Sequence, residues 1–329
     1  MDYRILGRTG RRVSALALGT WQFGGDWGEV SREDAFSVLD ASYDAGVTLF
    51  DTADVYGDGR SEQLIGEWLK ANPAADVFVA TKMIRRSSGH DLAAATLENF
   101  REWTDRSRSN LGVDTLDLVQ LHCPTSEVYD ADRVFDDLDT LVAEGAIAHY
   151  GVSVETVDEA LRAIRRPGVA SVQIILNAFR QKPLERALPA AVEAGVGILA
   201  RVPLASGLLS GRYTRDTSFP AGDHRSYNRH GEAFDVGETF SGVPFEIGVD
   251  AAARFTAIAR DAGLEPAAAA LAWVAQQQGV SAVIPGVRNA GQARANAAAG
   301  AIGALTQEFS DAVRALYDEA IRPSVHERW

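Results

Sequence analysis

Short apolar runs alternate with longer amphipathic stretches along almost the whole chain, and this alternation constrains the fold more than any other feature. Eight of the runs are brief and largely apolar, which is typical of strands buried on both faces. The amphipathic stretches between them predict helices, so the pattern is β-α repetition around a parallel sheet. The predicted strands are 15–18, 48–50, 77–80, 118–121, 150–152, 172–176, 198–202 and 282–284.

The predicted helices fill the intervals between these strands. Residues 31–34, Ser-Arg-Glu-Asp, resemble a capping box, and we expect them to open a helix that ends near Asp44. Ser61 is expected to open a second helix. Further helices are expected at about 91–111, 131–144, 157–165, 184–194 and 266–278, from 250 after the longest loop, and from 290 onwards.

Eight strands of this kind fit a closed (β/α)8 barrel, the TIM barrel, better than an open doubly wound sheet. Because such barrels reach this length as one unit, residues 1–329 are interpreted as a single domain. The first dozen residues are expected to form a hairpin that closes the far end of the barrel. The segment 203–249, after the seventh strand, is long, polar and rich in glycine and proline, and we expect it to cover the ligand.

Charge and composition argue against several classes of partner. A formal charge of −13 disfavours a nucleic acid or an anionic membrane, although single arginines could still hold a phosphorylated ligand. Cys123 is the only cysteine, so an internal disulfide is impossible, as suits a reducing compartment. No apolar run approaches the roughly 20 residues that span a bilayer, and the N-terminus has no signal-peptide core. We therefore expect a cytoplasmic protein that acts on a small molecule.

Polar residues that could carry chemistry stand at or shortly behind the predicted strands, where barrels place their catalytic groups. They include Asp51, Tyr56, Lys82 and His122. An unperturbed tyrosine has a pKa of about 10, and a neighbouring Lys82 ammonium would lower it by favouring the phenolate. Asp51 could hold that ammonium, and a neutral His122 could orient and polarise a carbonyl oxygen. The combination suggests acid catalysis on a carbonyl.

Each of these residues also has a structural interpretation that the sequence leaves open. Asp51 could cap the next turn, and Tyr56 could be a packed loop aromatic. Lys82 could lie at the surface, and His122 could be a core histidine. Their joint placement at the ends of successive strands favours the catalytic interpretation.

The residues around these positions resemble the signature of the aldo-keto reductase superfamily. The run 49–57, LFDTADVYG, is followed by Ser61-Glu62 as in that family. The later motifs occur in the family's order, and together they span almost the whole chain. They are Thr81-Lys82, Leu121-His122, Gly151-Val152-Ser153 and Ile284-Pro285-Gly286.

The resemblance implies a (β/α)8 barrel that binds NADP(H) in an extended form without a Rossmann fold. It implies that Tyr56 is the general acid and that Lys82 lowers its pKa. Asp51 would be the partner of Lys82, and His122 would orient the carbonyl. The implied cofactor contacts are Gly19, Thr20, Trp21, Ser153 and Gln173 near the nicotinamide, Leu204, Ser206, Gly207, Leu209 and Gly211 along the pyrophosphate, and Gly286, Arg288, Gln292 and Asn296 at the adenosine end.

The chain departs from the family's pattern at three cofactor positions. Val154 stands where an asparagine usually follows the serine, and Arg201 replaces an aromatic residue that often stacks on the nicotinamide. The Arg201 guanidinium could stack there instead, which would put a positive charge near the ring. Gly286 replaces a common lysine, which shifts recognition of the 2′-phosphate to Arg288, since a guanidinium forks onto phosphate oxygens. This combination resembles the bacterial branch related to inositol-utilisation reductases and potassium-channel β-subunits.

The predicted function is the reversible, NADPH-dependent reduction of an aldehyde or ketone to an alcohol, with Tyr56 as the general acid. The alternative is a slow-turnover NADP(H)-sensing subunit that acts through a protein partner, and a third hypothesis is a metal-dependent barrel hydrolase. The histidines show no H-x-H or H-E-x-x-H spacing, so no metal site is expected.

Several weaker candidates remain. Trp21, Phe23 and Trp27 follow the first strand and could line a substrate pocket or only pack. Cys123 lies beside His122, but no second base is evident, so it is not expected to be a nucleophile. Four residues of the long loop could touch the substrate or the cofactor's phosphates: Asp223, His224, Arg225 and Tyr227.

Overall fold

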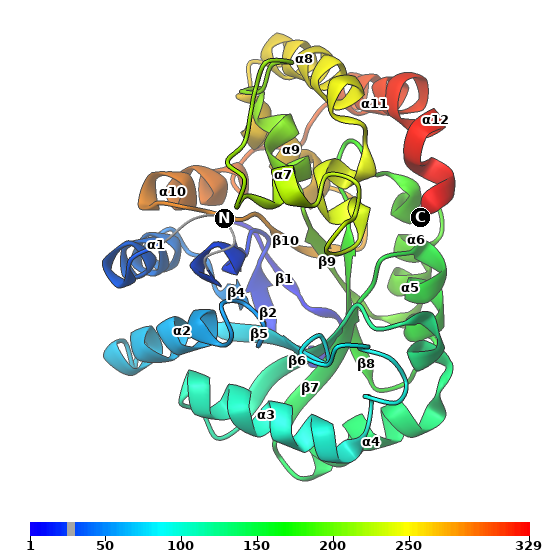
Figure 1. The fold of residues 1–329 in the computed structure, drawn as a ribbon. Coiled ribbons are helices and arrows are strands. Elements are labelled where there is room, and N and C mark those ends of the chain that lie inside the picture. The colour runs from blue at the N-terminus through cyan, green and yellow to red at the C-terminus, as the bar shows by residue number, and fades with distance from the viewer. Residues whose placement is uncertain (25–29) are drawn as a thin grey trace.

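The computed structural model describes residues 1–24 and 30–329, and its centre is a sheet of eight parallel strands (Figure 1). Each strand pairs with its neighbours in chain order, from β3 to β10. Backbone bridges from Leu16 to Val283 and from Gly19 to Gly286 join the first strand to the last. The sheet thus curls into the predicted (β/α)8 barrel, which is confirmed. The strands are β3 (Leu18–Gly19), β4 (Leu49–Asp51), β5 (Phe78–Met83), β6 (Leu116–His122), β7 (Ile147–Ser153), β8 (Val169–Ile175), β9 (Gly197–Arg201) and β10 (Val280–Ile284).

All eight predicted core strands are present, but their limits differ from the predicted ones. The first predicted strand, 15–18, is reduced to the two residues of β3. By contrast, β5 and β6 run past the apolar runs, so Lys82 and His122 lie within strands and not behind them. A polar residue that points into the barrel looks like the start of a loop in the sequence, although the backbone ladder continues through it.

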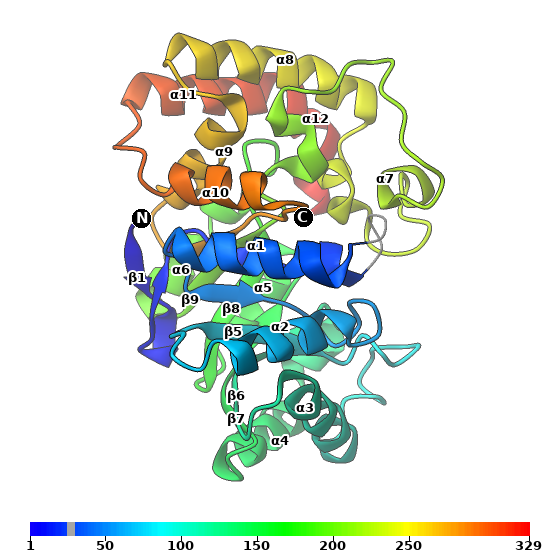
Figure 2. The same ribbon diagram turned by 90° about the vertical axis from the view of Figure 1, so that its left-hand side faces the viewer.

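The predicted N-terminal hairpin is confirmed, and it plugs the bottom of the barrel. Strands β1 (Tyr3–Ile5) and β2 (Arg12–Ser14) pair antiparallel. Leu6 and Val13 are fully buried and belong to one apolar cluster with residues of the barrel strands. Gly7 has a φ of +46°, and its backbone lies against that of Gly197 at the start of β9. Figure 2 shows the hairpin at one end of the barrel and helix α7 (His224–Tyr227) at the other.

Helices cover the outside of the barrel, and Ser31, Thr96 and Thr156 accept backbone hydrogen bonds as their N-caps. The helix predicted at 91–111 begins only at Leu97, because the Asp91 carboxylate accepts backbone N–H groups two and three residues later and forms a turn. Among the described helices, none combines the length and apolar character needed to cross a lipid bilayer. The helices are α1 (Arg32–Asp44), α2 (Arg60–Ala71), α3 (Leu97–Leu111), α4 (Asp132–Ala143), α5 (Val157–Ile164), α6 (Ala187–Ala194), α8 (Phe245–Asp261), α9 (Pro266–Ala275), α10 (Ala290–Ala299), α11 (Gln307–Leu316) and α12 (Arg322–Val325).

The predicted long loop after the seventh barrel strand is present, but it contains short helical turns of its own. These are η5 (Ala205–Ser210), α7, η6 (Val236–Glu238) and η7 (Phe240–Gly242), and α8 begins at Phe245, earlier than the predicted 250. The Phe240 ring lies 5.8 Å from the Phe219 ring and 5.1 Å from the Phe245 ring. The segment therefore has a small aromatic core and forms an ordered cover.

Candidate active site

A cleft of about 590 Å³ opens at the carboxyl ends of the barrel strands, where barrels keep their active sites. Asp51, Tyr56 and His122 form one part of its lining, the inner end, and Arg288 and Asn296 also line it. Most of the residues predicted to contact a cofactor line it. These are Gly19, Thr20, Trp21, Gln173, Arg201, Leu204, Ser206, Gly207, Gly286, Arg288, Gln292 and Asn296.

Three of the predicted cofactor residues are not part of the lining of the cleft. The Ser153 hydroxyl is buried and accepts a hydrogen bond from the Cys123 thiol at 3.3 Å. Leu209 packs in the apolar core, and Gly211 lies against Pro266. Ser153 and Leu209 are buried and Gly211 is exposed, and the direct contacts of all three with a cofactor stay predictions.

Lys82 lies beneath the inner end of the cleft, with only 1% of its surface exposed. Its ammonium donates to Asp51 Oδ1 at 2.7 Å and to the Thr52 carbonyl oxygen at 2.8 Å, and it lies 3.5 Å from the Tyr56 hydroxyl. Its three N–H donors therefore face three oxygen atoms. Burial opposes the charge, but the Asp51 carboxylate and Tyr56 outweigh it and raise the pKa of Lys82 above its ordinary value. The ammonium stays charged.

Two opposing influences act on the Tyr56 hydroxyl. Burial raises the pKa of Tyr56 above its ordinary value, and the Lys82 ammonium lowers it by a smaller amount. Lys82 thus acts in the predicted direction, but the net pKa of Tyr56 is raised because desolvation of the phenolate is the larger effect. At neutral pH the phenol keeps its proton and can act as a hydrogen-bond donor.

Glutamines from β6 and β8, the strands on either side of β7, face the second oxygen of Asp51. Gln173 Nε2 donates to Asp51 Oδ2 at 2.8 Å, and Gln120 Nε2 lies 3.5 Å from the same oxygen. Sequence reasoning assigned Gln173 to the cofactor and did not identify Gln120. The signal was available, because Gln120 is a polar residue inside an otherwise apolar run. Asp51 is therefore held on both of its oxygens.

His122 ends β6 and is 4% exposed, with its ring nearly perpendicular to the Tyr56 ring at a centroid separation of 6.0 Å. Burial is the main cause that holds the pKa of His122 well below its ordinary value, and the positive charges of Arg85, Lys82 and Arg201 act in the same direction. The imidazole is therefore neutral. Arg85 Nη1 lies 3.3 Å from His122 Nε2, a contact that sequence reasoning missed.

Arg201 is held by acidic and carbonyl groups. Its Nη2 donates to Glu155 Oε1 at 2.8 Å and to the Val154 carbonyl oxygen at 3.2 Å, and its Nη1 lies 3.7 Å from Glu238 Oε1. Val154, at the position of the family's asparagine, buries its side chain in the core. The positive charge of Arg201 is thus compensated by two carboxylates at the edge of the cleft.

Three arginines, Arg212, Arg225 and Arg288, also line the cleft. Asp223 organises two of them: Arg225 Nη2 lies 2.5 Å, and Arg288 Nη2 3.8 Å, from its Oδ2. Arg225 and Arg288 were among the sequence candidates. Arg212 was missed, although it directly follows Gly211 in the predicted pyrophosphate segment.

Aromatic residues of the covering segment pack on Trp21. The centroid of the Trp21 ring system lies 5.1 Å from that of His224 and 5.9 Å from that of Phe234. Phe23, the second aromatic candidate, is fully buried in the core and is not part of the lining of the cleft. Trp27 lies outside the described residues. Trp21 is therefore the described member of this trio that reaches the cleft.

Cys123 lies under the same wall as Arg201. Burial raises the pKa of the Cys123 thiol far above its ordinary value, which disfavours a nucleophilic thiolate. Its sulfur and carboxylate oxygens of Glu155 and Glu238 lie within 4.8 Å of one another. Because Arg85 and Arg201 pair with these carboxylates, guanidinium groups already neutralise the cluster.

This geometry can be compared with known proteins. Residues 15–318 match the model of the Aldo/keto reductase family. The chain belongs to the aldo/keto reductase family. The predicted membership is thereby confirmed, and it makes the protein an oxidoreductase of the class that acts on carbonyl compounds.

The proteins that this chain resembles include an aldo-keto reductase and a probable potassium-channel subunit. An aldo-keto reductase of Strobilurus tenacellus is 32% identical over 91% of this chain and 86% of its own length. A probable voltage-gated potassium channel subunit beta of Oryza sativa is 29% identical over 96% of both chains. The solved structure of a glycerol dehydrogenase from Gluconobacter oxydans is 30% identical, covers 97% of this chain and 95% of its own, and superposes with a TM-score of 0.79. Resemblance to channel β-subunits was predicted from the cofactor motifs.

Proposed function

We propose that this protein reduces an aldehyde or ketone to the corresponding alcohol, reversibly, with NADPH as cofactor and Tyr56 as general acid. The observation that carries the proposal is the buried Lys82 ammonium, which lies between the Asp51 carboxylate and the Tyr56 hydroxyl at the inner end of the cleft. A carbonyl oxygen placed beside Tyr56 would also lie close to the His122 ring. Donors fixed in this way stabilise negative charge as it develops on the oxygen.

The proton path follows from the electrostatics of the three residues. Tyr56 donates its proton to the carbonyl oxygen as negative charge develops there. Burial makes the resulting phenolate unfavourable, and the Lys82 ammonium stabilises it. Asp51, held by Gln173, keeps the ammonium charged and in place. In the reverse direction the same phenolate accepts the proton of the alcohol.

The cleft suits a phosphorylated cofactor, because three arginines line it together with Tyr56. Two glycines, Gly19 and Gly286, also line the cleft. Bound NADPH would supply a hydride to the carbonyl carbon. We assign its 2′-phosphate to Arg288, with Arg212 and Arg225 contributing positive charge.

The role of Tyr56 is tested by the variant Tyr56→Phe. We expect it to bind NADPH as the wild type does in a fluorescence titration, and to reduce 4-nitrobenzaldehyde more slowly by a factor of roughly 10² to 10⁴, the usual contribution of a general acid. Tyr43→Phe, on the outer helix α1, is the matched control and should retain full activity. Near-normal turnover by the Tyr56 variant would refute the assignment.

The assignment of Arg288 predicts a change in cofactor preference. A charge-assisted hydrogen bond contributes about 1.5–3 kcal/mol, so Arg288→Leu should weaken NADPH binding roughly 10- to 100-fold and leave NADH binding unchanged. Arg294→Leu, exposed on helix α10, which begins two residues after Arg288, serves as the control. Equal losses for both cofactors would contradict a contact with the 2′-phosphate.

Similarity to a potassium-channel β-subunit favours a second candidate function, an NADP(H)-sensing subunit with slow turnover that acts through a protein partner. Steady-state turnover separates the two functions. The assay should include aldehydes and also glycerol, because one of the similar solved structures is a glycerol dehydrogenase. A rate limited by cofactor exchange for every substrate would favour the sensor, and a substrate-dependent kcat would favour the reductase.

A further inference from the structure

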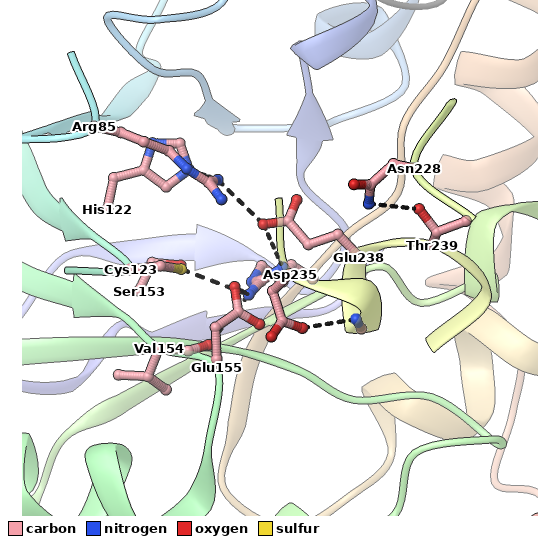
Figure 3. A network of polar contacts seen from close by, with 12 residues as sticks. Arg85, His122, Cys123, Ser153, Val154, Glu155, Asn228, Asp235, Glu238 and Thr239 are labelled. Atoms are coloured by element: carbon pink, nitrogen blue, oxygen red, sulfur yellow. Dashed lines mark hydrogen bonds and ion pairs between the residues drawn. The ribbon is translucent and has the colours of Figure 1, made fainter. Parts of the chain in front are cut away.

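A carboxylate of the cover, that of Glu238 in η6, lines the cleft and pairs with two arginines of the barrel (Figure 3). Its Oε1 accepts a hydrogen bond from Arg85 Nη1 at 3.1 Å and lies 3.7 Å from Arg201 Nη1. Burial opposes the charge, but Arg85 and Arg201 outweigh it and hold the pKa of Glu238 below its ordinary value. The carboxylate is therefore ionised, and both of its oxygens can only accept hydrogen bonds.

The second oxygen of this carboxylate is unused. Glu238 Oε2 accepts no hydrogen bond from residues 1–24 or 30–329, and the dashed lines in Figure 3 reach only the other oxygen. Because Glu238 lines the cleft, Oε2 is available to a bound ligand. Glu155, the other carboxylate that pairs with Arg201, differs in this respect, because its unpaired Oε2 is buried and the residue is not part of the lining of the cleft.

The Glu238 carboxylate is close to the residues proposed to act on the carbonyl group. Arg85 Nη1, which donates to Glu238, also lies 3.3 Å from His122 Nε2, so one guanidinium nitrogen separates the carboxylate from the imidazole. Burial is the main cause that raises the pKa of Tyr56, and the negative charge of Glu238 acts in the same direction. A substrate with its carbonyl beside Tyr56 and His122 would therefore place the substituents of its neighbouring carbon near Glu238.

Contacts within the cover hold Glu238 in place. Its carbonyl oxygen accepts a hydrogen bond from Ser206 Oγ at 3.0 Å. At the start of η6, Asp235 Oδ1 accepts one from the Gly237 N–H at 2.7 Å. An acceptor that is already fixed loses little conformational freedom when a ligand binds, so more of the hydrogen bond contributes to binding.

The backbone is strained where the barrel presents the two arginines. Ile84, directly before Arg85, has a φ of +83°, and Val202, directly after Arg201, has a φ of +54°. For β-branched residues such values are outliers. Strained residues persist only where the surrounding contacts impose them, and they cluster at functional sites.

The chemistry around Oε2 discriminates between the substituents that a substrate could present. Two arginines and two glutamates form the ion-pair group of Arg85, Glu238, Arg201 and Glu155, so their charges balance and an ammonium gains no net attraction. A carboxylate would face an ionised oxygen and be repelled. An alkyl group would take that oxygen out of water without a hydrogen bond, which costs free energy. A neutral hydroxyl would donate to it.

We propose that Glu238 is a specificity-determining residue whose Oε2 accepts a hydrogen bond from a hydroxyl on the carbon next to the substrate's carbonyl group. The preferred substrates are then α-hydroxy ketones and α-hydroxy aldehydes, and not their alkyl analogues. This preference rests on the proposed carbonyl reduction, whose substrate class it narrows.

The test compares the reduction of two ketones of similar shape, hydroxyacetone and butanone, with NADPH. An α-hydroxyl also makes a carbonyl more reactive, so the quantity of interest is the change that a substitution causes in the ratio of the two kcat/KM values. In Glu238→Gln a neutral amide replaces the ionised acceptor, and the preference for hydroxyacetone should fall roughly 5- to 10-fold. In Glu238→Ala it should fall roughly 10- to 100-fold, because no partner remains.

Methoxyacetone, which keeps the oxygen but has no hydrogen to donate, separates the hydrogen bond from the reactivity of the carbonyl. Its kcat/KM relative to that of butanone should be the same in the wild type and in both Glu238 variants. Glu232→Gln is the matched control, because Glu232 is an exposed carboxylate of the same cover, and it should leave every ratio unchanged.

A substitution that only loosened the cover would lower kcat/KM for both ketones and leave their ratio as it was. An unchanged ratio in the two Glu238 variants would therefore overturn the proposal, and so would a wild type that reduces methoxyacetone with the same kcat/KM as hydroxyacetone. Either result would leave the proposed reduction standing. If the wild type reduces no ketone and no aldehyde, 4-nitrobenzaldehyde included, the reduction itself is wrong and the role of Glu238 is refuted with it.

Discussion

At the scale of single residues, the site is built on one buried ion pair. The side chains of Lys82 and Asp51 are 1% and 5% exposed, so both charges have lost nearly all their contact with water. Hydrogen bonds from Lys82 to Thr52 and from Gln173 to Asp51 offset part of that desolvation. Removing one charge leaves the other buried without a counter-ion, whereas removing both leaves no unpaired charge in the core.

Replacement of Lys82 should therefore damage stability and activity separately. We expect Lys82→Met to lower the free energy of unfolding by about 3–5 kcal/mol, the usual effect of breaking a buried pair. It should also abolish aldehyde reduction, because the Tyr56 phenolate then loses the main positive charge that stabilises it. Adding Asp51→Asn should recover part of the lost stability and none of the activity. Urea unfolding and turnover assays measure the two effects.

The control for this pair of variants is Lys70→Met, since Lys70 is exposed near the end of α2. It should leave both quantities within error of the wild type. Recovery of turnover in the double variant would show that the phenol does not need the ammonium, and the proposed proton path would be wrong.

At the scale of elements, local pattern predicted the barrel, and contacts between distant elements could not be predicted in the same way. Eight apolar runs identified eight strands because burial on both faces leaves a direct trace in the sequence. The pairing of Arg85 with Glu238 leaves none, because the two residues lie 153 positions apart and each resembles an ordinary surface charge. The same holds for Arg212, whose role depends on how the cover folds back over the cleft.

The hairpin at the bottom of the barrel offers a test of one element in isolation from the chemistry. Gly7 and Gly10 both have positive φ, but a Cβ on Gly7 would lie 2.1 Å from the backbone nitrogen of Gly197, and a Cβ on Gly10 would meet open space. Gly10→Ala should lower the free energy of unfolding by about 1–2 kcal/mol, because alanine disfavours the left-handed conformation. Gly7→Ala should lower it clearly more, because the backbone must also move to make room for the Cβ.

Urea unfolding of the two glycine variants measures this difference, and the turnover of the folded fraction should be unchanged in both. Equal destabilisation by the two variants would mean that the hairpin can shift away from β9 without loss. In that case it would not act as a plug of the barrel.

At the scale of the whole molecule, contacts between distant parts of the chain favour one folding unit. Trp329, the last residue, lies with its ring 3.8 Å from the Arg180 guanidinium, and Arg4 of the hairpin donates to the Val280 carbonyl oxygen at the start of β10. We propose that residues 1–329 form a single domain that unfolds in one transition. Coincident loss of tryptophan fluorescence and circular dichroism in urea would support this, and two separate transitions would contradict it.

If unfolding is a single transition, a buried acid should make the stability of the whole chain depend on pH. Burial, with a smaller contribution from Glu62, raises the pKa of Asp54 from 3.8 to about 7. The folded state therefore binds a proton more tightly than the unfolded state, and stability falls as the pH rises between these two values. Asp54→Asn removes this titration, so its advantage over the wild type should grow by roughly 2–3 kcal/mol from pH 5 to pH 8. Asp44→Asn is the control, because Asp44 is exposed at the end of α1, and its stability should depend on pH as that of the wild type does. Parallel curves of stability against pH for the wild type and Asp54→Asn would show that the Asp54 carboxyl reaches water.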